Sequence, residues 1–341
     1  MREAARRILD RLGEAESRRI AVFGDYCLDK YLLIDSTRDE LSRETGLTAY
    51  QVTDVRHSAG AAGTVVNNLR ALGAQVMCAG LLGDDGEGFE LERALTATGA
   101  QTMLMTRSSQ YPTNVYIKPM RSQADGSYQE LNRLDIRSVR PLSPALEEDL
   151  IKSLRASTEW AMGVIVVDQY ETRNHSAVTD RIRAELALLA SRYPEKPIYV
   201  DSRRFAAAFR GIIVKCNEKE LVQAIDPQAD PEDLDAILRC GRALRERTGR
   251  AVVTTLGSRG ACVFESACET HIPAFRVEGP LDIVGAGDAT TAGTMLGLTL
   301  GLRLSEATLL GSCISSITIQ QIGTTGTASL DQVRKRLETL L

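Results

Sequence analysis

The sequence lacks the features that mark membrane proteins and nucleic-acid-binding proteins. No uninterrupted apolar run reaches the roughly 18 residues that a bilayer span requires. Basic residues are not in excess, because 41 Lys and Arg stand against 45 Asp and Glu, for a net charge of -4 at pH 7. Binding to nucleic acid or to an anionic membrane would lack its main electrostatic driving force. We therefore expect neither a nucleic-acid partner nor a membrane partner.

Cysteine and histidine are too scattered to indicate a disulfide framework or a zinc site. The 7 cysteines form no Cys-x-x-Cys pair and mostly have apolar neighbours, which predicts buried free thiols in a reducing compartment. The 3 histidines lie far apart in the sequence, which argues against a structural zinc site. The first 19 residues lack the apolar segment of a secretion signal and are expected to form an amphipathic helix. The expected location is the cytoplasm.

Two common nucleotide-binding patterns are also missing. The chain has no GxxxxGK[ST] sequence, which disfavours a Walker-type NTPase. Its most prominent glycine turn, at residues 285–288, is not GxGxxG and lies late in the chain rather than after the first strand. A dinucleotide-binding fingerprint is therefore disfavoured as well.

Short runs rich in Val and Ile alternate with segments of helical period. Such near-continuous apolar runs are typical of strands buried on both faces of a parallel sheet. The expected strands are 20–25, 76–84, 162–168, 197–201, 211–215 and 251–257, and the expected helices between them are 61–72, 87–98, 174–192 and 217–225. This alternation predicts one doubly wound, mostly parallel α/β sheet flanked by helices. In such a sheet, ligands collect at the carboxyl ends of the strands.

Two stretches interrupt this alternation. Residues 27–56 and 111–134 contain alternating polar and apolar segments separated by polar turns, which suits antiparallel strands outside the main sheet. We expect them to form a small β lid inserted in a single domain of residues 1–341. The last part of the chain is mostly helical in pattern, and the candidate helices there are 286–300, 304–321 and 328–341.

The most informative segment is Gly285–Asp288, a glycine turn that opens a long apolar helix. Free backbone N–H groups at a helix start carry the positive end of the helix dipole, so they can hold an anion. The Asp288 carboxylate could then accept the proton of a hydroxyl that attacks a phosphoryl group. The alternative is that Asp288 only interacts favourably with the helix dipole and that the glycines only allow a tight turn.

Two further segments carry candidate ligands. Asn217 and Glu220 follow a buried strand at a spacing that places both side chains on one face of a helix, where their oxygens could hold hydrated Mg²⁺. The alternative is an Asn N-cap with a capping Glu three positions later. Residues 252–264 form a strand, a glycine turn and a strand, which can cradle a phosphate or serve only as a hairpin.

In this order, the three segments resemble the PfkB/ribokinase family of carbohydrate kinases, and the resemblance covers nearly the whole chain. Residues 282–288 are similar to the family's D-T-x-G-A-G-D signature, 217–220 to its N-x-x-E motif, and 255–260 to its T-x-G-x-x-G nucleotide loop. Residues 24–32 and 58–88 are similar to its N-terminal substrate-binding turn and glycine-rich signature. Within the family, the nearest likeness is to the kinase half of the bifunctional heptose-phosphate kinase/ADP-heptose synthase.

The resemblance implies a ribokinase-like fold and ATP-dependent phosphorylation of a hydroxyl on a sugar or sugar phosphate. It implies ATP and Mg²⁺ as cofactors, and it makes a monovalent cation a further candidate. The site residues that it implies are the base Asp288, the anion hole Gly285, Ala286 and Gly287, the nucleotide loop Thr255, Gly257 and Gly260, the metal-positioning pair Asn217 and Glu220, and the acceptor-binding residues Asp29 and Gly60. The nucleotidyltransferase half of the bifunctional relatives has no counterpart, so we expect a stand-alone kinase.

Departures from the family pattern concern the acceptor. The family's Gly-Gly pair reads Ala59-Gly60, the Asn expected shortly afterwards reads Gly63, and Ile283 replaces the usual Thr. Loss of an amide that binds the substrate would change sugar recognition. A nucleoside kinase of the same fold and a non-catalytic sugar- or nucleotide-binding sensor therefore remain alternatives.

The expected lid also carries apolar residues, around Tyr31 to Ile34. Exposed apolar faces of this kind favour a homodimer through sheet-to-sheet contact, as in relatives. The alternative is a lid that packs only on its own domain.

Overall fold

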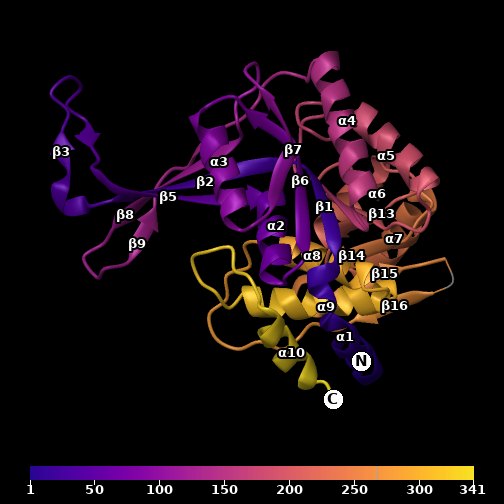
Figure 1. Cartoon of the computed structure of the whole chain (residues 1–341). Coiled ribbons are helices and arrows are strands. Elements are labelled where there is room, and N and C mark those ends of the chain that lie inside the picture. The colour runs from indigo at the N-terminus through magenta and orange to yellow at the C-terminus, as the bar shows by residue number, and fades with distance from the viewer. Residues whose placement is uncertain (267) are drawn as a thin grey trace.

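The computed structural model describes residues 1–266 and 268–341 (Figure 1). A nine-stranded sheet forms its centre, in the order β16-β15-β14-β13-β12-β11-β1-β6-β7. The strands are β1 (Arg19–Gly24), β6 (Gln75–Gly83), β7 (Gln101–Ser108), β11 (Gly163–Asp168), β12 (Ile198–Ser202), β13 (Ile213–Asn217), β14 (Val252–Thr255), β15 (Ala261–Phe264) and β16 (Glu269–Ile272). All neighbours pair in parallel except β15, which is antiparallel to both β14 and β16. The predicted α/β class with a mostly parallel sheet is confirmed.

Helices cover both faces of this sheet (Figure 1). One face is packed by α1 (Arg2–Leu12), α2 (Ala62–Ala71), α3 (Gly86–Ala97), α8 (Ala286–Thr299), α9 (Leu304–Thr318) and α10 (Leu330–Glu338). The other face is packed by α4 (Pro144–Trp160), α5 (Asp180–Arg192), α6 (Glu218–Ile225) and α7 (Leu234–Thr248). Short 3₁₀ turns lie at Ala15–Ser17, Ser36–Arg38, Ala206–Ala208 and Gly257–Arg259.

Alternation along the strands divides the core between these two layers. In β1, Ile20 and Val22 belong to the first apolar cluster, whereas Ala21 and Phe23 belong to the second. Successive side chains of a strand point to opposite faces, so a strand with helices on both sides is apolar at every position. The continuous Val- and Ile-rich runs of the sequence therefore correspond to central strands.

One predicted helix begins later than expected. The segment 174–192 was predicted to be helical throughout, but α5 begins only at Asp180, after the N-cap Thr179. The backbone N–H groups of Gln169, Tyr170 and Ala177 donate to the buried Asp25 carboxylate, which holds residues 169–177 in a loop. The pattern also missed β7, α4 and α7 as separate elements.

The cysteines follow the prediction with one exception. Six of them are buried as free thiols, and these are Cys27, Cys78, Cys216, Cys240, Cys262 and Cys313. The prediction was wrong for Cys268, which is exposed beside the short edge strand β16. In the part of the chain that the structure describes, no helix is long and apolar enough to cross a membrane.

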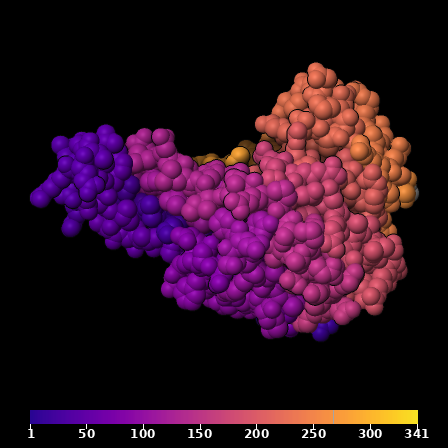
Figure 2. Space-filling model, turned by 90° about the horizontal axis from the view of Figure 1, so that it is seen from above, coloured from indigo at the N-terminus to yellow at the C-terminus, as the bar shows by residue number. Residues whose placement is uncertain are grey.

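A second, five-stranded sheet contains most of the two interrupting stretches. It consists of β2 (Tyr26–Ile34), β5 (Val52–Ala61), β8 (Val115–Ser122), β9 (Tyr128–Glu130) and β10 (Leu134–Ile136). Its pairs are antiparallel, as expected, apart from the parallel pair of β2 and β8. A two-stranded ribbon of β3 (Glu40–Leu41) and β4 (Thr48–Ala49) lies at its tip. Figure 1 shows this sheet as an arm that leaves the body, and Figure 2 shows a hollow between the arm and the C-terminal half.

Candidate active site

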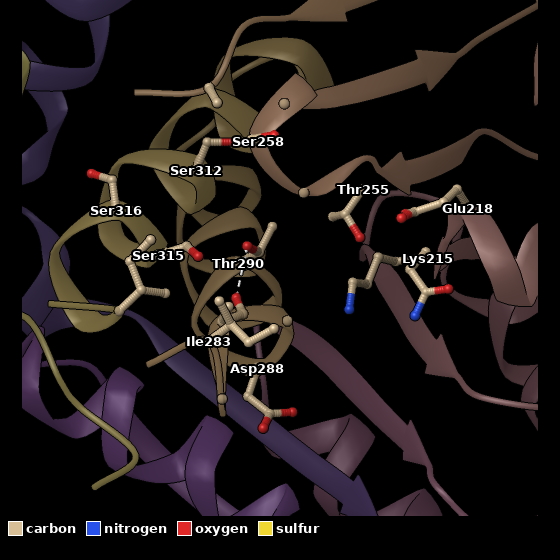
Figure 3. Close-up of a pocket in the computed structure, with 18 of the residues that line it drawn as sticks. Lys215, Glu218, Thr255, Ser258, Ile283, Asp288, Thr290, Ser312, Ser315 and Ser316 are labelled. Atoms are coloured by element: carbon tan, nitrogen blue, oxygen red, sulfur yellow. Dashed lines mark hydrogen bonds between the residues drawn. The ribbon is translucent and has the colours of Figure 1, made fainter. Parts of the chain in front are cut away.

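A cavity of about 850 Å³ lies at the carboxyl ends of β12, β13 and β14. Asp201, Lys215 and Thr255 line it from these strands, and Gly287 and Asp288 line it from the start of α8. Figure 3 shows Lys215, Thr255 and Asp288 around the cavity. The location agrees with the expectation that ligands collect at the carboxyl ends of parallel strands. Ser312, Ser315 and Ser316 line the wall formed by α9 (Figure 3).

The start of α8 has the backbone of an anion-binding turn. Gly285 is its N-cap, with a φ of +81° that favours glycine, and no side chain caps the helix. The N–H of Ala286 donates to the carbonyl of Ile283 at 3.1 Å. The N–H groups of Gly287 and Asp288 have no hydrogen-bond partner in the described part of the chain. These two groups and the N–H of Gly285, which also has no partner among the described residues, are therefore the free donors of the turn, whereas the N–H of Ala286 is occupied.

Asp288 lies in the first turn of α8, partly buried on the cavity wall. Burial raises the pKa of its carboxyl group to about 7, and the negative charge of Asp201 acts in the same direction. The positive charges of Lys215 and Arg203 lower this pKa, and Asp29 raises it. A carboxyl group with a pKa near neutrality can both accept and release a proton at physiological pH.

Lys215 is a buried residue in the middle of β13. Its Nζ donates to Oδ2 of Asp201 at 2.7 Å, and the Thr291 hydroxyl donates to the same oxygen at 2.8 Å. A Cβ built on Gly287 would lie 2.9 Å from Nζ, so the ammonium group lies against the glycine turn. Figure 3 shows the Lys215 side chain extending from β13 toward the start of α8.

Asn217 and Glu220 form the capping arrangement that the sequence left open as an alternative. The Asn217 Oδ1 accepts from the N–H of Glu220 at 2.9 Å, and the Glu220 Oε2 accepts from the N–H of Asn217 at 2.8 Å. These bonds begin α6 and occupy one oxygen of each side chain. Both residues line the cavity, and Oε1 of Glu220 remains available to a ligand.

The glycine turn between β14 and β15 lies on the same cavity. Thr255, Gly257 and Gly260 all line it. Gly260 has a φ of +92°, and a Cβ built there would lie 2.0 Å from the carbonyl oxygen of Ile272. Only glycine fits at this position, whether the hairpin binds a phosphate or only turns the chain.

The predicted acceptor residues Asp29 and Gly60 lie together on the arm, in β2 and β5. Asp29 is buried, and its Oδ1 lies 3.1 Å from Nζ of Lys118, which also donates to the Tyr31 hydroxyl at 3.2 Å. A Cβ on Gly60 would come within 2.8 Å of the Asp29 carboxylate, so the absence of a side chain makes room for that group. Since the charge of Asp29 contributes to the pKa of Asp288, the structure brings the two carboxylates near each other.

The turn before α2 has an unusual backbone conformation next to the matched pair Ala59 and Gly60. Ala61 has a φ of 51°, which an L-residue rarely adopts. Gly63, at the position of the family's Asn, lies in the first turn of α2. Thr64 is buried, and its Cγ2 lies 3.4 Å from a Cβ built on Gly285.

Sequence reasoning missed four charged residues of this region, and these are Lys118, Asp201, Arg203 and Lys215. A signal existed for two of them, because Lys215 interrupts the apolar run of β13 and Asp201 ends that of β12. Arg203 follows Asp201, lines the cavity and forms no ion pair within the described residues. Its nearness to Asp288 depends on the tertiary fold, so the linear sequence carried no signal for it.

Solved structures of known proteins define the class to which this fold belongs. Ribokinase of Arabidopsis thaliana, complexed with ribose and ATP, is 19% identical, covers 94% of this chain and 99% of its own, and superimposes with a TM-score of 0.69. Phosphofructokinase-2 of Escherichia coli, in complex with potassium, is 18% identical. The match covers 95% of this chain and 99% of that protein, with a TM-score of 0.72. The chain has the ribokinase-like α/β fold.

The sequence comparisons point to one family of kinases. Residues 183–331 match the pfkB family carbohydrate kinase model. Among curated proteins, the bifunctional protein HldE of Hyphomonas neptunium is 26% identical over 328 residues, which are 96% of this chain and 65% of that protein. HldE of Azorhizobium caulinodans is 29% identical over 317 residues, which are 92% of this chain and 63% of that protein. The chain thus spans less than two thirds of the length of these relatives.

Proposed function

We propose that the protein transfers the γ-phosphoryl group of ATP to a hydroxyl of a sugar or sugar phosphate. The observation that carries this proposal is the juxtaposition at the start of α8, where the Asp288 carboxyl group lies beside free backbone N–H donors. A base next to an anion-binding turn suits an alcohol that attacks a phosphoryl group. The match of residues 183–331 to the pfkB family model and the ribose and ATP bound to the Arabidopsis ribokinase support the choice of substrates.

In the proposed reaction, Asp288 takes the proton of the acceptor hydroxyl while the hydroxyl oxygen forms a bond to the γ-phosphorus. The bond between that phosphorus and the bridging oxygen breaks, and ADP leaves. The N–H groups of Gly287 and Asp288 stabilise the charge on the transferring group. The nucleotide phosphates lie along Thr255, Gly257 and Gly260. Asp288 begins the reaction deprotonated, which its pKa of about 7 permits for half of the molecules at neutral pH.

A magnesium ion fits this site through water more readily than by direct ligation. The described residues contain no cluster of three or more His, Cys, Asp or Glu arranged to hold a metal. Glu220 still presents one carboxylate oxygen to the cavity, and Asn217 lies beside it. Mg²⁺ keeps several of its waters and uses substrate phosphates as ligands, which suits one or two protein oxygens. When bound, it neutralises phosphate charge.

The acceptor is proposed to lie between the arm and the start of α8. Asp29 offers carboxylate oxygens that accept hydrogen bonds, and Lys118 offers donors, a pair that suits neighbouring hydroxyls. Closure of the arm over the acceptor would exclude water and limit ATP hydrolysis, so we propose that it acts as the lid.

We also propose that two copies associate through the arm. Its strand register places Leu32, Val55, Ile117 and Leu134 on one face, and Val55 and Leu134 are exposed. Asp29 and Lys118 lie on the opposite face. The face with Leu32 and Val55 also carries Lys30 and His57 nearer the body. Exposed apolar residues on a projecting sheet suit contact with a second arm.

The test is a coupled assay of ATP consumption over a panel of sugars, sugar phosphates and nucleosides, with K⁺ and Mg²⁺ present. We expect turnover with a sugar or sugar phosphate and loss of turnover, by roughly 100-fold or more, in Asp288→Asn, with ATP binding retained. Turnover only with nucleosides would identify the protein as a nucleoside kinase. Binding of ligands without turnover of any acceptor would identify the protein as a sensor and would contradict the proposed kinase function.

A further inference from the structure

The strand β13 carries a charged residue where its pattern requires apolar ones. Val214 and Cys216 are fully buried, and Lys215 between them is only 4% exposed. Removing an ammonium group from water is costly unless it is paired and hydrogen-bonded. A buried lysine in the middle of an interior strand therefore calls for an explanation beyond packing.

The pairing of Lys215 is built from two other elements. Asp201 is its cross-strand neighbour in β12, and the Asp201 Oδ2 lies 2.7 Å from Nζ. Thr291, one turn into α8, donates to the same oxygen at 2.8 Å. An ammonium group has three donors, and in the described part of the chain Asp201 is the sole hydrogen-bond partner of this one. Two donors therefore remain for a ligand in the cavity that Lys215 lines.

The ammonium group is fixed against the glycine turn. A Cβ on Gly287 would lie 2.9 Å from Nζ, closer than ordinary contact. Gly287 does not have a positive φ, so its backbone conformation does not itself demand glycine. The absence of a side chain at this position instead leaves the space in which the ammonium group approaches the free N–H groups of the turn.

We propose that Lys215 is a further catalytic residue, which donates a hydrogen bond to an oxygen of the transferring phosphoryl group, and that Asp201 and Thr291 are positioning residues for it. The inference rests on the proposed function, which places that group at the Gly285–Gly287 turn. Lys215 keeps its protons throughout, because Asp288 alone receives the hydroxyl proton. A fixed positive charge at the transferring oxygens stabilises the transition state without reorganisation.

The first test compares nucleotide affinities in Lys215→Met. Calorimetric titration with ATP and with ADP, both with Mg²⁺, isolates the contribution of the γ-phosphate without any acceptor. We expect the Kd for ATP to rise about 10- to 100-fold, the loss expected for one hydrogen bond to a charged group, and the Kd for ADP to change less than about twofold. Lys152→Met, which removes an exposed lysine of α4, is the matched control and should leave both Kd values unchanged.

The second test separates positioning from structural support. Four charged groups act on Asp288, namely Asp29, Asp201, Arg203 and Lys215. Because Lys215 lowers the pKa of Asp288 and Asp201 raises it, Lys215→Met should move the acidic limb of kcat/KM to higher pH and Asp201→Asn should move it to lower pH. Thr291→Val should lower kcat without moving the limb. Loss of activity in all three with an unmoved limb would indicate structural support only and overturn the inference.

Folding of the variants is checked by thermal unfolding. Lys215→Met leaves Asp201 buried without its cation, and if this variant does not fold, the double variant Lys215→Met, Asp201→Asn replaces it in the titrations. An unchanged preference for ATP over ADP in a folded variant would overturn the role of Lys215 and leave the proposed kinase function intact. A wild-type protein that phosphorylates no acceptor, but whose Lys215→Met variant binds ATP more weakly, would overturn the proposed function and retain the phosphate contact.

Discussion

Replacement of Gly287 by Ala should lower the activity of the protein while leaving its stability nearly unchanged. The added Cβ would lie 2.9 Å from Nζ of Lys215, whereas ordinary contacts lie at 3.4–4 Å. The Lys215 side chain must therefore move by about half an ångström or more, because the helix backbone that carries the new carbon is fixed. A shift of this size lengthens its 2.7 Å bond to Asp201 or displaces the ammonium group from the phosphoryl group.

The expected magnitudes follow from these contacts. Loss of one hydrogen bond to a charged group costs about 1.5–3 kcal/mol, which lowers kcat about 10- to 150-fold if it occurs in the transition state. The free energy of unfolding should change by no more than about 1 kcal/mol, because Ala favours the helix over Gly by a similar amount. A coupled assay and urea unfolding measure the two quantities.

Two controls make this result interpretable. Gly86→Ala, at the start of α3, adds a Cβ with no heavy atom within 4 Å, so it should leave kcat unchanged and raise the free energy of unfolding by no more than about 1 kcal/mol. Gly285→Ala forces a φ of +81° on alanine and should destabilise the fold by about 1–2 kcal/mol. Wild-type kcat in Gly287→Ala would refute the reasoning, because it would show that the space beside Nζ is not used in the reaction.

Three further predictions concern other parts of the molecule. Since Asp288 must be deprotonated to act as the base and its pKa is about 7, kcat/KM should fall about tenfold per pH unit below that value; a flat profile between pH 5 and 8 would contradict this role. Ala61→Gly should relieve the strain at a φ of 51° and raise the free energy of unfolding by about 1 kcal/mol, measured by urea unfolding, whereas destabilisation would show that the alanine methyl group packs well enough to offset it. Val55→Asp and Leu134→Asp should each reduce the molar mass measured by light scattering, and monomeric wild-type protein would exclude the dimer through the arm.

The alternation of apolar runs and helical segments was enough to predict the fold class. Each predicted central strand lies in the main sheet, because a strand buried on both faces leaves a signal at every residue. The start of α5 was wrong because buried Asp25, about 150 residues away in the chain, holds the preceding loop. Patterns within a short window cannot contain a contact of that sequence separation.

The candidate site was predictable where one short segment carries it. Gly285–Asp288 and the glycine turn at 255–260 were found because each is a continuous motif. The role of Asn217 and Glu220 was left open, and the structure shows that their spacing forms a capping box on the cavity wall. Lys215 could not be linked to Gly287 from the sequence, because strand order decides which residues of β13 and α8 meet.

The connection between β1 and β2 joins the arm directly to the central sheet, so residues of the arm lie at different distances from this junction. Only Asp25 separates the end of β1 at Gly24 from the start of β2 at Tyr26, so the central strand leads directly into the arm (Figure 1). At about 3.3 Å per residue, Asp29 lies about 13 Å from this pivot and Ile34 about 30 Å. A rotation about Asp25 therefore moves the tip more than twice as far as Asp29. In the proposed lid closure, the outer strands would therefore travel more than twice as far over the hollow as Asp29, the proposed acceptor-binding carboxylate.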